Sequence, residues 1–106
     1  MDAVVFVYTT WPDAALAEAA GRELVADKLA ACVNIVPGMV SVYAWQGAIE
    51  RAEEAVMIVK TRASLADAVA AAVRAVHPYD TPAIVTLPIA GGDPAYLAWI
   101  LAETAG

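Results

Sequence analysis

The central part of the chain reads "ACVNIVPGMVSVYAWQG" (31–47) followed directly by "AIERAEEAVMIVKT" (48–61). β-Branched and aromatic residues dominate both segments and favour strands, and Gln46-Gly47 between them is typical of a tight hairpin turn. Because proline cannot donate to a strand ladder, Pro37-Gly38 predicts a bulge, a bend or an edge position in the first strand. The central sequence therefore predicts one long antiparallel hairpin, interrupted once.

A strand and a helix are predicted before this hairpin. The apolar segment "VVFVYTT" (4–10) is too short for a helix of its own and predicts a buried strand. Pro12 suits the first turn of a helix, and Asp13 complements the positive end of the helix dipole. The following sixteen residues are rich in Ala, Leu and Glu. Four-residue spacing predicts a buried stripe made of Leu16, Ala20 and Leu24.

A helix, a strand and a last helix are predicted after the hairpin. Ser64 followed by Asp67 approximates a capping box, and Pro78 ends the second helix so that His77 lies just beyond it. The apolar stripe of this helix consists of Leu65, Val69, Val73 and Val76. "AIVTLPI" (83–89) predicts the final strand, and Asp93-Pro94 predicts the start of a C-terminal helix.

The order of these elements predicts an α+β fold. We expect a ferredoxin-like βαββαβ sandwich with an additional C-terminal helix, in a single domain spanning 1–106. Both crossover helices would cover one face of an antiparallel sheet. The other face would then expose apolar side chains and require a partner, so we expect self-association.

The composition of the chain limits the classes of molecule to which it could bind and the compartment in which it is expected. The 106 residues are 61% apolar and carry a net charge of −6, and such a negative field argues against binding to nucleic acid. The uncharged stretch Leu29 to Ile49 is broken by Pro37-Gly38 and by polar residues, so no membrane helix is expected. A single cysteine excludes an internal disulfide, and the first residues lack the features of a signal peptide. We expect a cytoplasmic protein.

His77 is the only histidine and begins the stiff connector "HPYDTP" (77–82). An imidazole in this place either interacts with the negative end of the preceding helix or serves as a ligand, and the residues leave both interpretations open. Cys32 is equally ambiguous, because a lone cysteine in a strand is usually a small buried side chain but can be a soft metal ligand.

No catalytic pattern emerges from the remaining polar residues. Glu50, Glu53 and Glu54 are typical of a solvated strand face, although Glu50 and Glu54 would share a face and could capture a cation weakly. The chain has no Gly-rich phosphate loop and no G-x-S-x-G motif. An acylphosphatase-like reading of Asn34 and the arginines lacks a phosphate loop around them. We therefore do not expect an enzyme.

Three segments nevertheless resemble one family over almost the whole chain. "LAACVNIVPGMVSVYAWQGAIERAEEAVMIVKT" (29–61), "HPYDTPAIVTLPI" (77–89) and "GDPAYLAWI" (92–100) are similar to the CutA divalent-cation tolerance family. The resemblance implies a ferredoxin-like protomer in a stable homotrimer, with Tyr43 and Trp45 of the hairpin at the subunit interface. It also implies a link to tolerance of divalent metals, copper especially.

The resemblance implies a metal site only in part. In members credited with copper binding, a cysteine takes the place of Thr9 and a second histidine that of Val76, and this chain keeps His77 alone. We therefore expect weak binding of copper or another divalent cation through His77, with Cys32 as a second candidate ligand and without an organic cofactor.

The family trimer also resembles PII-type signalling proteins, which bind small effectors in clefts between subunits. This likeness implies an alternative function as a small-molecule sensor or protein adaptor. The corresponding cleft would lie near Lys60, Tyr79 and Asp80.

Overall fold

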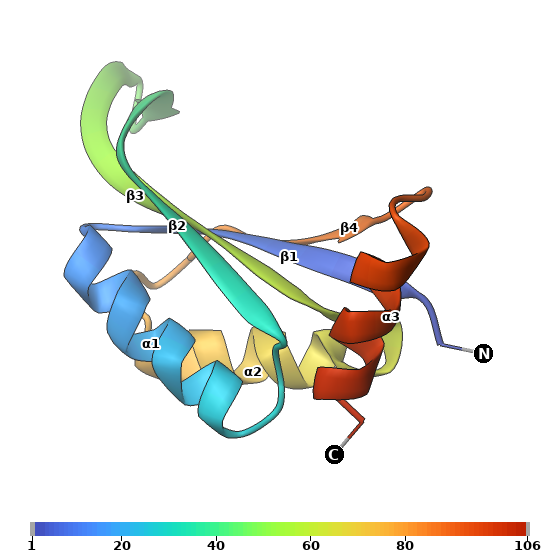
Figure 1. The fold of residues 1–106 in the computed structure, drawn as a ribbon. Helices are drawn as coiled ribbons and strands as arrows, with labels where there is room; N and C mark the ends of the chain where they lie inside the picture. The colour runs from blue at the N-terminus through green and yellow to red at the C-terminus, as the bar shows by residue number, and fades with distance from the viewer. Residues whose placement is uncertain (1, 106) are drawn as a thin grey trace.

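The computed structural model describes residues 2–105 and contains a four-stranded sheet, three α-helices and a short 3-10 turn (Figure 1). In chain order the elements are β1 (Val4–Trp11), α1 (Ala14–Ala26), β2 (Cys32–Trp45), β3 (Ala48–Arg62), the 3-10 turn (Ala63–Leu65), α2 (Ala66–Val76), β4 (Ile84–Pro88) and α3 (Pro94–Glu103). No helix within residues 2–105 is both long and apolar enough to cross a membrane.

The strands form one antiparallel sheet in the order β2-β3-β1-β4. Together with the element order, this arrangement is the split βαβ pattern that the sequence predicts. The α+β fold with an additional C-terminal helix is thus confirmed.

Helices cover the two faces of the sheet unequally. Figure 1 shows α1 and α2 side by side beneath the sheet, and Val7, Trp11, Met57 and Val59 of the sheet belong to the core that faces them. Neighbouring residues of a strand point to opposite faces, so Phe6 lies on the other side. There α3 packs against Phe6 through Leu97 and Leu101, around the buried Ile100.

The predicted buried stripe of α1 is only partly right. The buried residues are Ala17, Ala20, Gly21 and Leu24, whereas Leu16 is 42% exposed. Asp13 lies before the helix as its N-cap, and its Oδ1 accepts a hydrogen bond from the Leu16 amide at 2.8 Å. Small residues therefore lie closest to the sheet, and Leu16 turns outward.

The capping box predicted for α2 is wrong. Ser64 lies in the 3-10 turn, where its amide and its hydroxyl both donate to the Asp2 carboxylate, and α2 begins at Ala66 without a side-chain cap. Of the predicted stripe, Val69 and Val73 are buried, whereas Val76 is 54% exposed. By contrast, Asp93 caps α3 as predicted by accepting from the Tyr96 amide at 3.0 Å.

The hairpin confirms both of its predicted irregularities. Gln46 and Gly47 turn the chain with positive φ angles of 49° and 81°, as a tight hairpin turn requires. The β2–β3 register shifts between Val36 and Met39, where Gly38 has a φ of +75°. The strand continues beyond this bulge, and Figure 1 shows the end of the hairpin rising away from the sheet.

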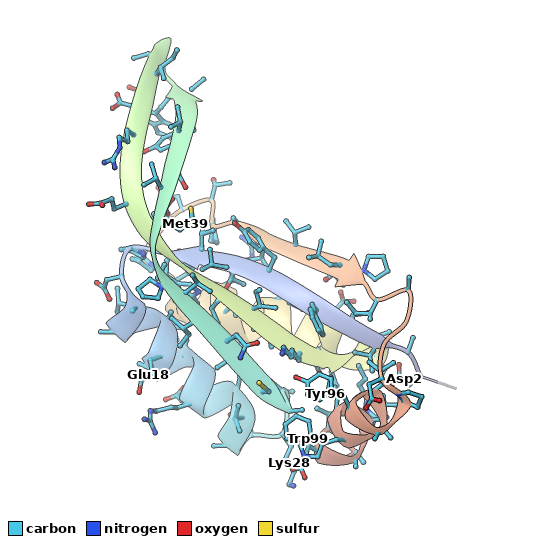
Figure 2. All side chains as sticks on the ribbon, turned by 45° about the horizontal axis from the view of Figure 1, so that its top comes forward. Asp2, Glu18, Lys28, Met39, Tyr96 and Trp99 are labelled. Atoms are coloured by element: carbon cyan, nitrogen blue, oxygen red, sulfur yellow. The ribbon has the colours of Figure 1, made fainter. Side chains whose placement is uncertain are left out.

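We call this outer part of the hairpin, Met39–Trp45 paired with Ala48–Glu54, the arm. The last residue of β1, Trp11, pairs with Ala55, so the arm begins where β1 ends. Figure 2 labels Met39 at the base of the arm.

Candidate functional site

His77 is the C-cap of α2 and has the extended backbone (φ −76°, ψ 135°) expected for a residue before proline. Its Nε2 lies 2.7 Å from the carbonyl oxygen of Thr10, and its Nδ1 lies 3.1 Å from the backbone nitrogen of Tyr79. A carbonyl only accepts and an amide only donates, so Nε2 carries the proton and Nδ1 is the acceptor. Both ring nitrogens are therefore engaged within the protein.

The His77 imidazole also lies between two aromatic rings. Its centroid is 4.3 Å from that of Trp11 and 4.8 Å from that of Tyr79. The Tyr79 hydroxyl in turn donates to Oε2 of Glu54 at 3.1 Å. Partial burial and, after it, the Glu54 carboxylate raise the pKa of the Tyr79 phenol above its usual value. His77 and Tyr79 thus form one packed unit that connects the end of α2 to β1 and β3.

The residues of one chain do not fit a copper site of the kind the resemblance implies. Thr9 is fully buried on the side of α1 and α2, where its hydroxyl donates to the Met57 carbonyl and accepts from the Trp11 indole, both at 2.8 Å. Val76 carries no donor atom. Among residues 2–105, no group of three or more His, Cys, Asp or Glu side chains is placed to hold a metal ion.

The structure also keeps Cys32 away from His77. Cys32 pairs with Lys60, which pairs with Phe6, whereas His77 contacts Thr10 at the other end of β1. Cys32 is half-buried, and the Asn34 amide nitrogen lies 3.7 Å from its thiol sulfur. The two tentative metal ligands are therefore separate within one subunit.

The three residues of the expected ligand cleft fall into two places. The Lys60 ammonium donates to the Tyr96 hydroxyl at 2.7 Å and lies 5.4 Å from the centroid of the Phe6 ring. Tyr79 instead meets Glu54, six residues away from Lys60 along β3 and hence about 20 Å distant. Asp80 is exposed beside Tyr79. A cleft that joins Lys60 to Tyr79 does not form within one chain.

Among residues 2–105, the three most exposed of the large apolar side chains lie on the arm. Tyr43 and Trp45, expected at a subunit interface, are 44% and 60% exposed, and Val42 and Ile49 reach 69% and 83%. Strand alternation places Tyr43 and Trp45 on one face and Val42 on the other. The arm is thus apolar on two faces, a feature typical of a surface that another chain covers.

Sequence reasoning missed the contact between Tyr79 and Glu54. The sequence predicts a solvated face for Glu54 together with Glu50 and Glu53, but Glu54 is half-buried, while the other two are exposed. No pattern in the sequence distinguishes it from its neighbours, because the partner is 25 residues away.

Comparisons with known proteins establish the family and the fold. The family described as "CutA1 divalent ion tolerance protein" matches residues 5–103. The "Divalent-cation tolerance protein CutA" of Thermus thermophilus is 42% identical over 104 residues, which cover 98% of this chain and 99% of that protein. The crystal structure of the divalent ion tolerance protein CutA1 from Ehrlichia chaffeensis has a TM-score of 0.94 at 34% identity, and the match covers 100% of this chain and 99% of that one.

Plant and animal relatives are longer. "Protein CutA 1, chloroplastic" of Oryza sativa is 44% identical over 100 residues, which are 94% of this chain but 56% of that protein. The chain spans about half to three fifths of the length of these relatives, from 52% to 62%.

Proposed function

Because the chain belongs to the CutA1 divalent ion tolerance family, we propose that it acts in divalent-cation tolerance as a homotrimer whose subunits cover one another's arms and open sheet faces. The observation that carries the assembly is the exposure of Trp45, Val42 and Ile49 on an arm that projects from the sheet (Figure 1). A group of exposed apolar side chains gathered on one element is typical of an interaction surface.

Light scattering tests the assembly. We expect a mass about three times 11.0 kDa at micromolar concentration, and a shift toward smaller species for a Tyr43→Ala/Trp45→Ala variant. Val76→Ala is the matched control, because Val76 is similarly exposed but lies on the helical side. A wild-type mass of one chain would contradict the proposal.

A growth assay tests the role in metal tolerance. Expression of this protein in a strain that lacks its own family member should restore growth of that strain on toxic concentrations of copper.

We further propose that copper or another divalent cation binds His77 only weakly. Both imidazole nitrogens are engaged, so a metal ion would have to displace either the Thr10 carbonyl or the Tyr79 amide. A single imidazole with no second ligand nearby holds copper poorly. The family's role in metal tolerance then does not require a tight site in one subunit.

An anaerobic copper titration against a competing chelator tests this step in the wild type, in His77→Ala and in the control Cys32→Ser. We expect weak binding that falls further in His77→Ala and not in Cys32→Ser. One tight equivalent per subunit would show that the subunits together build a site. Binding that is identical in wild type and His77→Ala would remove His77 as a ligand.

A further inference from the structure

The arm lacks support from the rest of the sheet. Inward of Ala55, β3 lies between β2 and β1, but from Glu54 to the turn it pairs with β2 alone. A hairpin of two strands is at best marginally stable in water. The bulge between Val36 and Met39 removes ladder pairing at the same point. The direction of the arm must therefore be held by contacts at its base.

One contact from outside the hairpin reaches this base. Glu54 pairs with Met39, the first pair beyond the bulge, and its carboxylate accepts the hydrogen bond from the Tyr79 hydroxyl at 3.1 Å. The neighbouring Glu53 has only a loose pairing with Arg51 at 4.0 Å, with both side chains exposed. Glu54 is thus the acidic residue of β3 whose side chain is hydrogen-bonded to the connector 77–82.

The connector 77–82 is itself firmly attached to the body of the protein. His77 donates to the Thr10 carbonyl and accepts from the Tyr79 amide, and its ring centroid lies 4.3 Å from that of Trp11, a side chain that is 1% exposed. Pro78 further restricts the backbone between His77 and Tyr79. Tyr79 is therefore a rigid contact point rather than a freely moving side chain.

We propose that the connector 77–82 is a brace for the arm, with Tyr79 and Glu54 as the residues that position it. The arm is about 20 Å long, so a tilt of about 10° at its base would displace its tip by about 3–4 Å. A displacement of this size breaks close side-chain packing. The brace thereby determines how firmly the arm engages a neighbouring subunit, a consequence that rests on the proposed homotrimer.

Subunit exchange between unlabelled and ¹⁵N-labelled protein, followed by native mass spectrometry, measures this engagement. We expect Tyr79→Phe and Glu54→Ala to exchange subunits about fivefold faster than the wild type, because each removes one hydrogen bond to a carboxylate. Glu54→Gln retains an acceptor oxygen and should stay within about twofold of the wild type. The double variant Tyr79→Phe/Glu54→Ala should exchange no faster than either single variant, because both remove the same contact.

Tyr96→Phe is the matched control. Tyr96 is 39% exposed, as is Tyr79, and its hydroxyl also has one side-chain partner, but it lies on α3 far from the arm. A wild-type exchange rate in Tyr79→Phe, an equally fast rate in Tyr96→Phe, or additive effects in the double variant would each overturn the brace.

The proposed brace and the proposed homotrimer can be rejected independently of each other. If light scattering finds a single chain, the proposed assembly is wrong, and hydrogen–deuterium exchange of amides 39–54 then tests the brace in the isolated chain. We expect those amides to exchange about fivefold faster in Tyr79→Phe while the amides of β1 remain unchanged. Equal protection of the arm in both proteins would overturn the brace in the monomer as well.

Discussion

Asp2 joins two parts of the chain that are far apart in sequence. Its carboxylate accepts from the amide and the hydroxyl of Ser64 and lies 3.6 Å from the Arg62 guanidinium. Arg62 in turn donates to the Thr104 hydroxyl at 3.0 Å and to the Leu101 carbonyl. One carboxylate and one guanidinium thus connect the start of the chain, the turn before α2 and the end of α3.

This arrangement predicts a specific dependence of stability on pH. The Ser64 hydroxyl, together with the Ser64 amide and Arg62, lowers the pKa of Asp2 despite some desolvation. A lowered folded-state pKa contributes stability above the ordinary value near 4, and this contribution is lost as the pH falls through the folded pKa. We expect the urea midpoint of Asp2→Asn to fall less than that of the wild type between pH 5 and pH 2.5.

The control for this measurement is Asp67→Asn, which alters an exposed carboxylate in the first turn of α2. Parallel pH profiles of wild type and Asp2→Asn would show that the Asp2 cluster does not contribute to the pH dependence of stability.

Asp93 could be predicted as a cap because its partner, the Tyr96 amide, is three residues away. The hydrogen bonds from Ser64 to Asp2 could not, because 62 residues separate the two.

At the scale of the elements, the packing of α1 depends on one glycine. A Cβ atom at Gly21 would lie 2.7 Å from Cγ2 of Val33 and 3.0 Å from Sδ of Met57, so the helix approaches the sheet closely here. Gly21→Ala should gain about 1 kcal/mol of helix propensity. The overpacking should cost about 1–3 kcal/mol, which leaves the variant less stable.

Denaturant unfolding at a fixed protein concentration measures this balance. Ala19→Gly on the exposed side of α1 calibrates the propensity contribution and should cost about 1 kcal/mol. If Gly21→Ala were more stable than the wild type, the close approach of α1 to the sheet would be wrong.

Features of the elements that depend on the local backbone could be predicted from the sequence, whereas those that depend on tertiary contacts could not. The hairpin turn at Gln46-Gly47 and the bulge at Pro37-Gly38 depend on the local backbone, and both follow from the residues themselves. The buried face of α1 depends instead on how closely the helix approaches β2 and β3. Four-residue spacing favoured Leu16, whereas the tertiary contact uses the smaller Ala17 and Gly21.

At the scale of the whole molecule, the local features of the candidate site could likewise be predicted from the sequence, and its tertiary contacts could not. The position of His77 at the end of α2 could be predicted from Pro78. Its engagement with Thr10 and Trp11 could not, because the topology alone brings β1 to that end of α2. An uncovered apolar sheet face was predicted from the order of the elements; Val85 and Leu87 of β4 are exposed on that face, although α3 covers another part of it.

The proposed assembly of acidic subunits through their apolar arms predicts an unusual response to salt. Each chain has a net charge of −6, so association brings like charges together while it buries residues such as Trp45 and Ile49. The Debye length falls from about 30 Å at 0.01 M salt to about 3 Å at 1 M, which screens the repulsion. Burial of apolar area does not depend on this screening. We therefore expect sedimentation equilibrium to show weaker dissociation in 1 M than in 0.01 M sodium chloride.

Trp45→Ala should dissociate more readily than the wild type at both concentrations, because it removes apolar contact and no charge. Dissociation that increases with salt would instead show that ion pairs between subunits, rather than the apolar arms, hold the assembly together.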